Sequence, residues 1–140
     1  MMRRVLIVCL GNYCRSPFAA LALAHRGGTE LEVRSAGLIG KWEGEPAHMA
    51  MVKAAGRLGL DLTTHRARQI TLEMMAWADT IVAMDTHVRD VLIDVCGESN
   101  QSKLALYLRD RDVPDPMGQA QEAFNECAVL ISAGTALHIG

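Results

Sequence analysis

The feature that most constrains the fold is a tight segment between an apolar run and an amphipathic run. Residues 5–8 read Val-Leu-Ile-Val, a short run that is typical of a buried β-strand. Residues 18–24 carry apolar side chains at helical spacing, and we expect Ser16 to cap that helix with Pro17 in its first turn. The sequence therefore predicts a strand, a tight loop and the start of a helix in immediate succession.

A loop in this position can bind an oxyanion, because its backbone N–H groups converge and the helix N-terminus adds partial positive charge. Cys9 opens the loop and Arg15 closes it, with five residues between them. The guanidinium can hold two phosphate oxygens, and the same field favours the thiolate form of the cysteine. Such a thiolate is a nucleophile for phosphoryl transfer, and Ser16 can donate a hydrogen bond to it as it leaves. The alternative is a buried cysteine at a strand end and a surface arginine.

The rest of the chain alternates between strand-like and helix-like segments. Strands are predicted at residues 5–8, 30–35, 80–84 and 103–108. Helices are predicted at residues 17–26, 47–58, 71–78, 86–96 and 124–137, and we expect Asp85 to cap the fourth of them. We therefore expect an α/β fold, a four-stranded parallel sheet with helices on both faces in three α/β/α layers. The Cys9 loop would lie at the carboxyl ends of the strands, where such sheets bind ligands.

Length and composition limit the classes of protein to which the chain can belong. The 140 residues suit a single domain covering 1–140, and the net charge of −2 argues against nucleic acid as a partner. The sequence contains no apolar run long enough to cross a membrane and no signal-peptide pattern. Its four cysteines do not suggest a disulfide framework, so we expect a cytoplasmic protein. We also expect a monomer, because the low net charge and the few aromatic residues give no sign of an obligate interface. We expect no metal site, because the cysteines and histidines lack metal-ligand spacing.

The segment Val8–Pro17 resembles the phosphate-binding loop of the low-molecular-weight protein tyrosine phosphatases, whose signature is C-x5-R-[ST] near the N-terminus. Residues 65–70, His-Arg-Ala-Arg-Gln-Ile, also resemble this family, and the resemblance covers nearly the whole chain. It implies a phosphatase that forms a cysteinyl-phosphate and needs no cofactor. The expected phosphate cradle consists of Leu10, Gly11, Asn12, Tyr13, Cys14 and Arg15. The residues that the resemblance assigns to holding this loop rigid are His65, Asn12, Ser16 and Ser35. For His65, a helix cap or a surface position is the alternative.

A phosphate ester also needs an acid that protonates its leaving oxygen. Residues 109–118 follow the last predicted strand, and Asp110, Asp112 and Asp115 in this loop have suitable side chains. Pro116 restricts the backbone of Asp115 toward an extended conformation, which fixes its direction. The family carries its general acid in an Asp-Pro step here, so the resemblance implies Asp115. A turn without a catalytic role is the alternative.

Three side chains are candidates for the wall of the substrate pocket. Trp42 lies on a predicted loop, where it can line the site or fold onto the core of its own domain. The family carries an aromatic residue near this position. It also carries an aromatic residue after the Asp-Pro step, where this chain has Met117. Methionine can still contact an aromatic ring, and Tyr13 in the loop can supply aromatic contact instead.

Cys14 shares the loop with the nucleophile, and its thiol can trap an oxidised Cys9 as a reversible disulfide. The alternative is a small buried side chain, which is the role expected of Cys96 and Cys127.

One competing function is a thioredoxin-coupled arsenate reductase, which needs two further cysteines as a close pair, whereas only Cys96 lies in that region. Another is a phosphate-binding module without activity, which the intact Cys9 and Asp115 oppose. The resemblance to the bacterial branch implies phosphotyrosine proteins as partners, with a tyrosine kinase of polysaccharide export among them.

Overall fold

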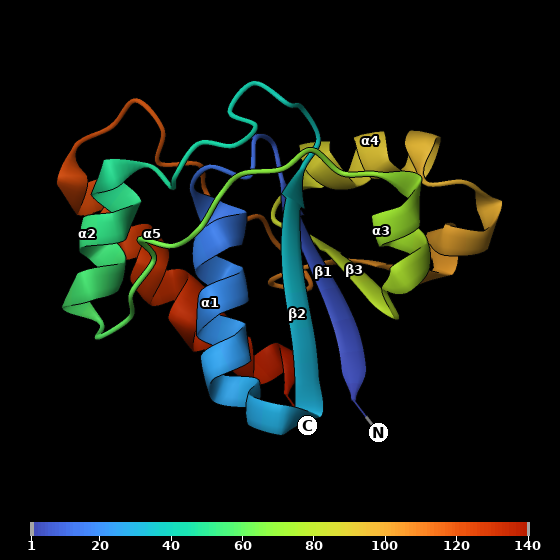
Figure 1. Ribbon diagram of the computed structural model, residues 1–140, viewed down its shortest axis with the longest axis horizontal. Coiled ribbons are helices and arrows are strands. Elements are labelled where there is room, and N and C mark those ends of the chain that lie inside the picture. The colour runs from blue at the N-terminus through green and yellow to red at the C-terminus, as the bar shows by residue number, and fades with distance from the viewer. Residues whose placement is uncertain (1, 140) are drawn as a thin grey trace.

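Four parallel strands form the centre of the molecule in the computed structural model, which describes residues 2–139 (Figure 1). They are β1 (Arg3–Cys9), β2 (Leu31–Gly37), β3 (Thr80–Ala83) and β4 (Leu104–Leu106). Their order across the sheet is β2-β1-β3-β4, and every neighbouring pair is parallel. The predicted four-stranded parallel sheet is therefore confirmed. The central strand β1 is buried from Val5 to Cys9, which explains why its sequence is continuously apolar.

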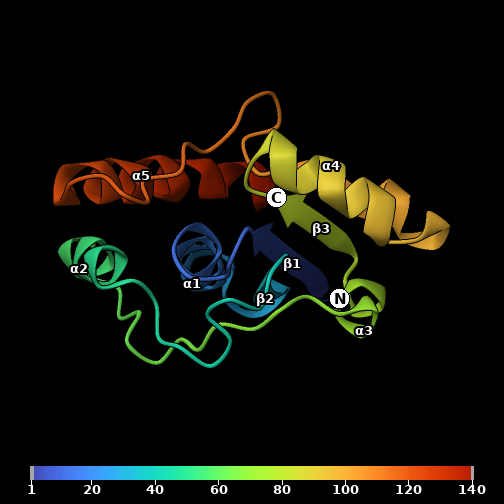
Figure 2. The ribbon, with the colours of Figure 1, turned by 90° about the horizontal axis from the view of Figure 1, so that it is seen from above.

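Helices cover both faces of this sheet. One face carries α1 (Arg15–Gly27), α2 (Met49–Arg57) and α5 (Gln121–Gly134). The other carries α3 (Leu72–Trp77) and α4 (Thr86–Val95). Figure 1 shows the two groups on opposite sides of the strands, and Figure 2 shows the same layers from above. The two buried cores lie between the sheet and these groups, so the predicted three-layer α/β/α arrangement is confirmed.

The start of α1 differs from the prediction, because one of its side chains serves the loop instead of the helix. Helix α1 begins at Arg15, and Cys14 occupies the N-cap position without a side-chain hydrogen bond. The prediction that Ser16 caps this helix is therefore wrong, because its hydroxyl contacts Cys9 and Asn12 instead. By contrast, the predicted cap of α4 is confirmed, since Asp85 accepts a hydrogen bond from the backbone N–H of Val88.

The carboxyl ends of the strands lie together at one edge of the sheet, uppermost in Figure 1. The chain runs from β1 to β2 on one side and later returns to β3 on the other, so the order of strands reverses beside β1. Open α/β sheets bind ligands at such a reversal. The loop from Cys9 to Arg15 leaves β1 at this point and leads directly into α1. Within the described residues, no helix is both long enough and apolar enough to cross a membrane.

A buried histidine connects the last turn of the chain to the sheet. His138 is 6% exposed, and its ring lies 4.7 Å from that of Tyr107. Its Nε2 atom is 2.7 Å from the carbonyl oxygen of Tyr107. Burial lowers the pKa of His138 below its usual 6.5. The unfolded chain therefore takes up a proton at His138 at a higher pH than the folded chain does.

This difference predicts a loss of stability in mild acid. As the pH falls from about 7.5 through 6.5, the free energy of unfolding should decline, and the loss contributed by His138 should end below its folded-state pKa. The variant His138→Gln should show a shallower decline in urea unfolding followed over this range. His25→Gln, which alters an exposed histidine of α1, is the matched control and should keep the wild-type slope. An unchanged slope in His138→Gln would contradict the prediction.

Candidate active site

The loop after β1 is held from outside through its carbonyl groups. Backbone N–H groups of Leu38 and Ile39 donate to the carbonyls of Cys9 and Leu10, at 3.1 and 3.0 Å. The carbonyl of Asn12 contacts His65 Nε2 at 2.9 Å. That of Tyr13 accepts from the N–H of His48 at 2.8 Å. Four carbonyls of the loop thus face outward, toward the protein that surrounds it.

The outward carbonyls determine where the N–H groups point. In a trans peptide the N–H lies opposite the preceding carbonyl, so the N–H groups of Leu10, Gly11, Tyr13 and Cys14 face the interior of the loop. Within residues 2–139, these four groups donate to no protein acceptor. The N-terminus of α1 adds its partial positive charge at the same place. The loop is therefore a nest of hydrogen-bond donors suited to an oxyanion.

Asn12 gives the loop its shape. Its backbone has a positive φ of 56°, a conformation that asparagine tolerates better than most residues. Its side-chain amide donates to the hydroxyls of Ser16 and Ser35, both at 2.9 Å, and its side-chain oxygen accepts from the N–H of Arg68 at 2.9 Å. Together with the contact from His65, these bonds bring together the four residues assigned to holding the loop.

His65 contacts the loop as a neutral side chain. Burial lowers its pKa below 6.5, an effect that its hydrogen bond to the carbonyl of Asn12 only partly offsets. A neutral imidazole can donate to a carbonyl only from a protonated nitrogen, so Nε2 carries the proton. His65 is thus a fixed donor that helps to keep the Asn12 carbonyl turned outward.

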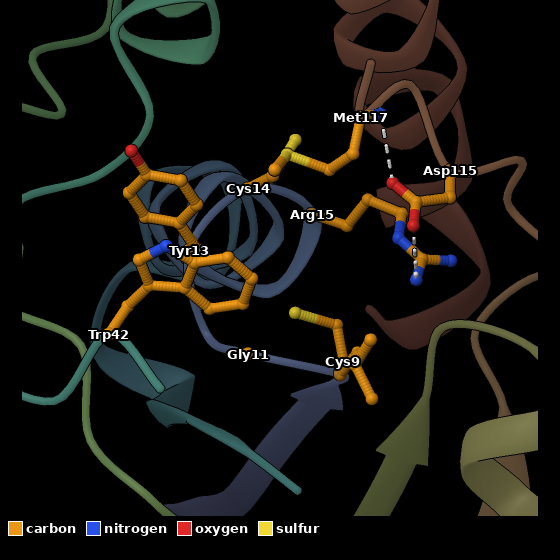
Figure 3. A pocket seen from close by; sticks show the side chains of 9 residues that line it. Cys9, Gly11, Tyr13, Cys14, Arg15, Trp42, Asp115 and Met117 are labelled. Carbon is orange, nitrogen blue, oxygen red and sulfur yellow. Dashed lines mark hydrogen bonds and ion pairs between the residues drawn. The ribbon is translucent and has the colours of Figure 1, made fainter. Parts of the chain in front are cut away.

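The structure places the candidate nucleophile at the floor of the nest. Cys9 is 3% exposed, and its Sγ atom lies 2.9 Å from the hydroxyl of Ser16. Because that hydroxyl oxygen also accepts a hydrogen bond from Asn12, its own proton is free to point at the sulfur. Figure 3 shows the sulfur between the rings of Tyr13 and Trp42 on one side and the side chain of Arg15 on the other.

Arg15 brings a buried positive charge to the site. The residue is 3% exposed, and its Nη1 atom donates to Asp85 and to the carbonyl of Val113, both at 2.8 Å. Burial is the largest influence and works against the charge, but the hydrogen bond to Asp85 and the nearby negative charges together outweigh it, so the pKa of Arg15 is raised. Both hydrogen bonds use the same nitrogen. The edge formed by Nε and Nη2 therefore remains for two oxygens of an anion.

Asp85 is a site residue that sequence reasoning identified only as a helix cap. One carboxylate oxygen accepts from Val88 N–H and the other from Arg15, each at 2.8 Å. Burial acts to raise the pKa of Asp85, but the hydrogen bonds from Val88 and Arg15 hold it below its usual 3.8. The available signal was its position directly after β3, the strand next to β1 in the sheet. Its charge stabilises the guanidinium that faces the nest.

Of the three aspartates in the loop after β4, only Asp115 lines the pocket together with Cys9 and Arg15. Its carboxylate lies 3.9 Å from Arg15 Nη2 and accepts a hydrogen bond from the N–H of Met117 at 3.0 Å (Figure 3). Asp112 instead accepts from the N–H and hydroxyl of Thr86, at 2.9 and 2.6 Å, which anchors the loop to α4. Asp115 is thus the one of the three that shares the pocket with the Cys9 sulfur, and its role as the acid stays a prediction.

The pocket has an aromatic side and a thioether side. The rings of Tyr13 and Trp42 are stacked, with centroids 4.7 Å apart and planes 7° apart. Both line the pocket with Met117, so Trp42 contacts the site rather than the core of the domain. Its loop is tied down, because Gly44 N–H donates to Ala67 and Ala67 N–H to Glu45, each at 2.8 Å. We call Tyr13 and Trp42 the aromatic wall.

Two glycines allow these parts to approach one another. A Cβ atom on Gly11 would lie 2.2 Å from the ring of Trp42. One on Gly37, at the end of β2, would lie 2.5 Å from the backbone carbon of Gly11 and 2.6 Å from the nitrogen of Asn12. The Trp42 ring could move aside, but the loop backbone could not without leaving its hydrogen bonds. Gly37 therefore fixes how closely β2 supports the nest.

The four cysteines differ in their surroundings, and all have free thiols. Cys14 lines the pocket, and burial raises its pKa above the usual range. Burial also raises the pKa of Cys127 to about 12, and this thiol contacts the carbonyl of Pro114 in the loop after β4. Cys96 lies in the other core, beneath α3 and α4. Among the residues described, no three or more histidine, cysteine, aspartate or glutamate side chains form a group that could hold a metal ion.

Comparison with known proteins identifies the class to which this fold and site belong. The family model described as low molecular weight phosphotyrosine protein phosphatase matches residues 4–137. Wzb of Salmonella typhi, named a low molecular weight protein-tyrosine-phosphatase, is 35% identical over 134 residues, or 94% of this chain and 88% of Wzb. A protein-arginine-phosphatase of Geobacillus stearothermophilus is 31% identical over 125 residues, or 86% and 83% of the two chains.

The solved structures agree with this assignment. Wzb of Vibrio vulnificus, in complex with benzylphosphonate, matches with a TM-score of 0.90 at 26% identity, covering 99% of this chain and 97% of that one. The chain therefore belongs to the low molecular weight phosphotyrosine protein phosphatase family.

The role of Gly37 predicts a specific defect. In Gly37→Ala the new Cβ should displace the backbone of the nest, so inorganic phosphate should bind at least about tenfold more weakly and the fold should lose about 1–3 kcal/mol. Calorimetric titration and urea unfolding measure the two effects. Gly56→Ala is the control, because this exposed position in α2 has no atom within 4 Å of the added Cβ and should gain about 0.5–1 kcal/mol. Unchanged phosphate affinity in Gly37→Ala would contradict the role of close backbone approach.

Proposed function

We propose that this protein is a cysteine-dependent protein tyrosine phosphatase that hydrolyses aryl phosphate monoesters without a metal or cofactor. The observation that carries the proposal is that four kinds of chemical group meet in one pocket. These are the sulfur of Cys9, the unpartnered N–H groups of its loop, the guanidinium of Arg15 and the carboxyl of Asp115. The names of the relatives in the family support it.

In the first step the phosphate oxygens bind to the N–H groups of the nest and to the free edge of Arg15. The Cys9 thiolate attacks phosphorus, so an S–P bond forms while the bond from phosphorus to the leaving oxygen breaks. Charge on the equatorial oxygens is stabilised by donors that are already in place. Asp115 transfers its proton to the leaving oxygen, which departs as a neutral phenol.

In the second step water attacks the cysteinyl-phosphate. Asp115, now a carboxylate, accepts a proton from the water as the new P–O bond forms. The S–P bond breaks, and its electron pair returns to the sulfur as a thiolate. The hydroxyl of Ser16, 2.9 Å from that sulfur, donates a hydrogen bond that stabilises the departing anion. Inorganic phosphate then leaves, and Asp115 has regained its proton.

The placement of the cysteines favours this chemistry over arsenate reduction. A reductase relay needs cysteines that carry a disulfide outward from the nucleophile, whereas Cys96 lies on the opposite face of the sheet. Cys14, inside the loop, is the one neighbour proposed to protect an oxidised Cys9 as a disulfide. A phosphate-binding module without activity would have no use for a carboxyl group in the same pocket as the sulfur. The position of Asp115 therefore supports an enzyme.

We further propose phosphotyrosine proteins as substrates, including a bacterial tyrosine kinase, with a cytoplasmic monomer as the working form. The aromatic wall and Met117 offer apolar surfaces to an aryl ring. The relative named a protein-arginine-phosphatase makes phosphoarginine the second substrate class to be tested. A phosphoarginine guanidinium needs acceptors around its nitrogens, and among the described residues Asp115 is the one carboxylate that lines the pocket. This pocket therefore favours the aryl ester.

The function is tested by Cys9→Ser. The wild type should hydrolyse a phosphotyrosyl peptide in preference to a phosphoarginyl peptide of the same sequence, and Cys9→Ser should reduce kcat at least about 10³-fold. Phosphate release is the measurement. Cys96→Ser, which changes a thiol on the other face of the sheet, is the control and should retain activity. Preferential hydrolysis of the phosphoarginyl peptide would contradict phosphotyrosine as the substrate class. Thioredoxin-dependent arsenate reduction without phosphatase activity would overturn the proposal.

The role of Asp115 is tested by the leaving group. In Asp115→Asn, kcat/KM for phenyl phosphate should fall about 10²–10⁴-fold, because phenoxide leaves poorly without a proton. The loss for 4-nitrophenyl phosphate should be much smaller, since nitrophenolate is a stable anion. Asp110→Asn alters an exposed aspartate of the same loop and should affect neither ester. Equal losses for the two esters in Asp115→Asn would place the acid elsewhere.

A further inference from the structure

His48 contacts the phosphate loop although it lies far from it in the sequence. Its backbone N–H donates to the carbonyl of Tyr13 at 2.8 Å. Its ring meets the ring of Tyr13 edge to face, with centroids 5.3 Å apart and planes 66° apart. The opposite partner is Phe124 of α5, a buried residue whose ring stacks with that of His48 at 4.7 Å and 22°. One histidine therefore connects the nest to the core.

The same side chain also begins helix α2. His48 occupies the N-cap position, and its Nδ1 atom accepts a hydrogen bond from Ala50 N–H at 3.0 Å. This bond and the stack on Phe124 fix the ring by two independent contacts. A ring held in this way has little freedom to rotate. It can therefore act as a rigid support for whatever packs against it.

What packs against it is Tyr13, half of the aromatic wall. The Tyr13 ring has the face of Trp42 on one side and the ring of His48 on another, and its backbone is held by His48 as well. Trp42 in turn lies directly over Gly11 of the nest. The rings of the wall are thus held at a set distance from the sulfur. Met117, on the other side of the pocket, is a flexible side chain that can adapt but cannot define a slot.

We propose that His48 is a positioning residue that holds Tyr13 against Trp42 and so sets the preference of the pocket for aryl over simple phosphate ligands. This rests on the proposed function of the site. The wall gains affinity because Tyr13 and Trp42 lose no rotational freedom when an aryl ring arrives. The His48 side chain does not line the pocket, and substitutions of it keep the backbone N–H that bonds to the Tyr13 carbonyl. Changes to this side chain should therefore affect recognition of the ring and leave the chemical step unchanged.

Two variants separate the ring of His48 from its helix cap. His48→Asn supplies a short acceptor suited to the N-cap but removes the ring. His48→Phe keeps a ring between Tyr13 and Phe124 but removes the acceptor. Calorimetric titration with phenylphosphonate and with inorganic phosphate gives the aryl preference as a ratio of dissociation constants. Because neither ligand reacts, this readout remains interpretable even if the catalytic proposal fails, which would appear as absent hydrolysis by the wild type.

His48→Asn should weaken phenylphosphonate binding about three- to tenfold, leave phosphate binding within about twofold, and raise KM for phenyl phosphate with little change in kcat. His48→Phe should restore the aryl preference, which a role limited to capping α2 would not allow. In a Tyr13→Leu background His48→Asn should have no further effect on that preference. His87→Asn, an exposed histidine of α4, is the control. Equal weakening of both ligands by His48→Asn, or failure of His48→Phe to restore the ratio, would overturn the proposal.

Discussion

The site depends on a peptide loop whose carbonyls are bonded from outside. A tight turn can point either end of its peptide dipoles inward, and inward carbonyls would repel an anion. The contacts from Leu38, Ile39, His48 and His65 select the arrangement in which the N–H groups face in. Asn12 contributes its positive φ and its bonds to the surrounding chain. Much of the fold around β1 can therefore be understood as support for one set of N–H directions.

The second requirement is a buried cation that stays charged and keeps its orientation. Moving a guanidinium out of water is costly, and Arg15 is nearly fully buried. Asp85 offsets this cost and also accepts a hydrogen bond from Nη1, the nitrogen that does not face the nest. Since Asp85 caps α4 at the same time, the position of the guanidinium is linked to a helix on the far side of the sheet. Val113 ties the loop of the acid to the same nitrogen, so the cation and the acid share one support.

The sequence predicted those parts of the site whose information is local. Cys9 and Arg15 share one short loop between a strand and a helix, so position and residue type were enough to single them out. The loop after the last strand offered three aspartates, and only the resemblance to the family pointed to Asp115 among them. The hydrogen bond that Arg15 donates to Asp85 joins residues seventy positions apart, and no local pattern reports it. The helix cap assigned to Ser16 failed for the opposite reason. A local rule predicted it, but the hydroxyl found tertiary partners in Cys9 and Asn12.

The aromatic wall shows how a departure from the family pattern can be compensated within the fold. The resemblance implies an aromatic residue where this chain has Met117, and Tyr13 supplies an aromatic ring from the phosphate loop instead. An aromatic ring on the loop after β4 would be positioned by a segment that must also place Asp115 to donate its proton. A ring on the phosphate loop is placed by the hydrogen bonds that define the nest itself. Its distance from the sulfur of Cys9 is therefore set by the same contacts that hold the phosphate, and recognition of the ring becomes a property of the rigid half of the site.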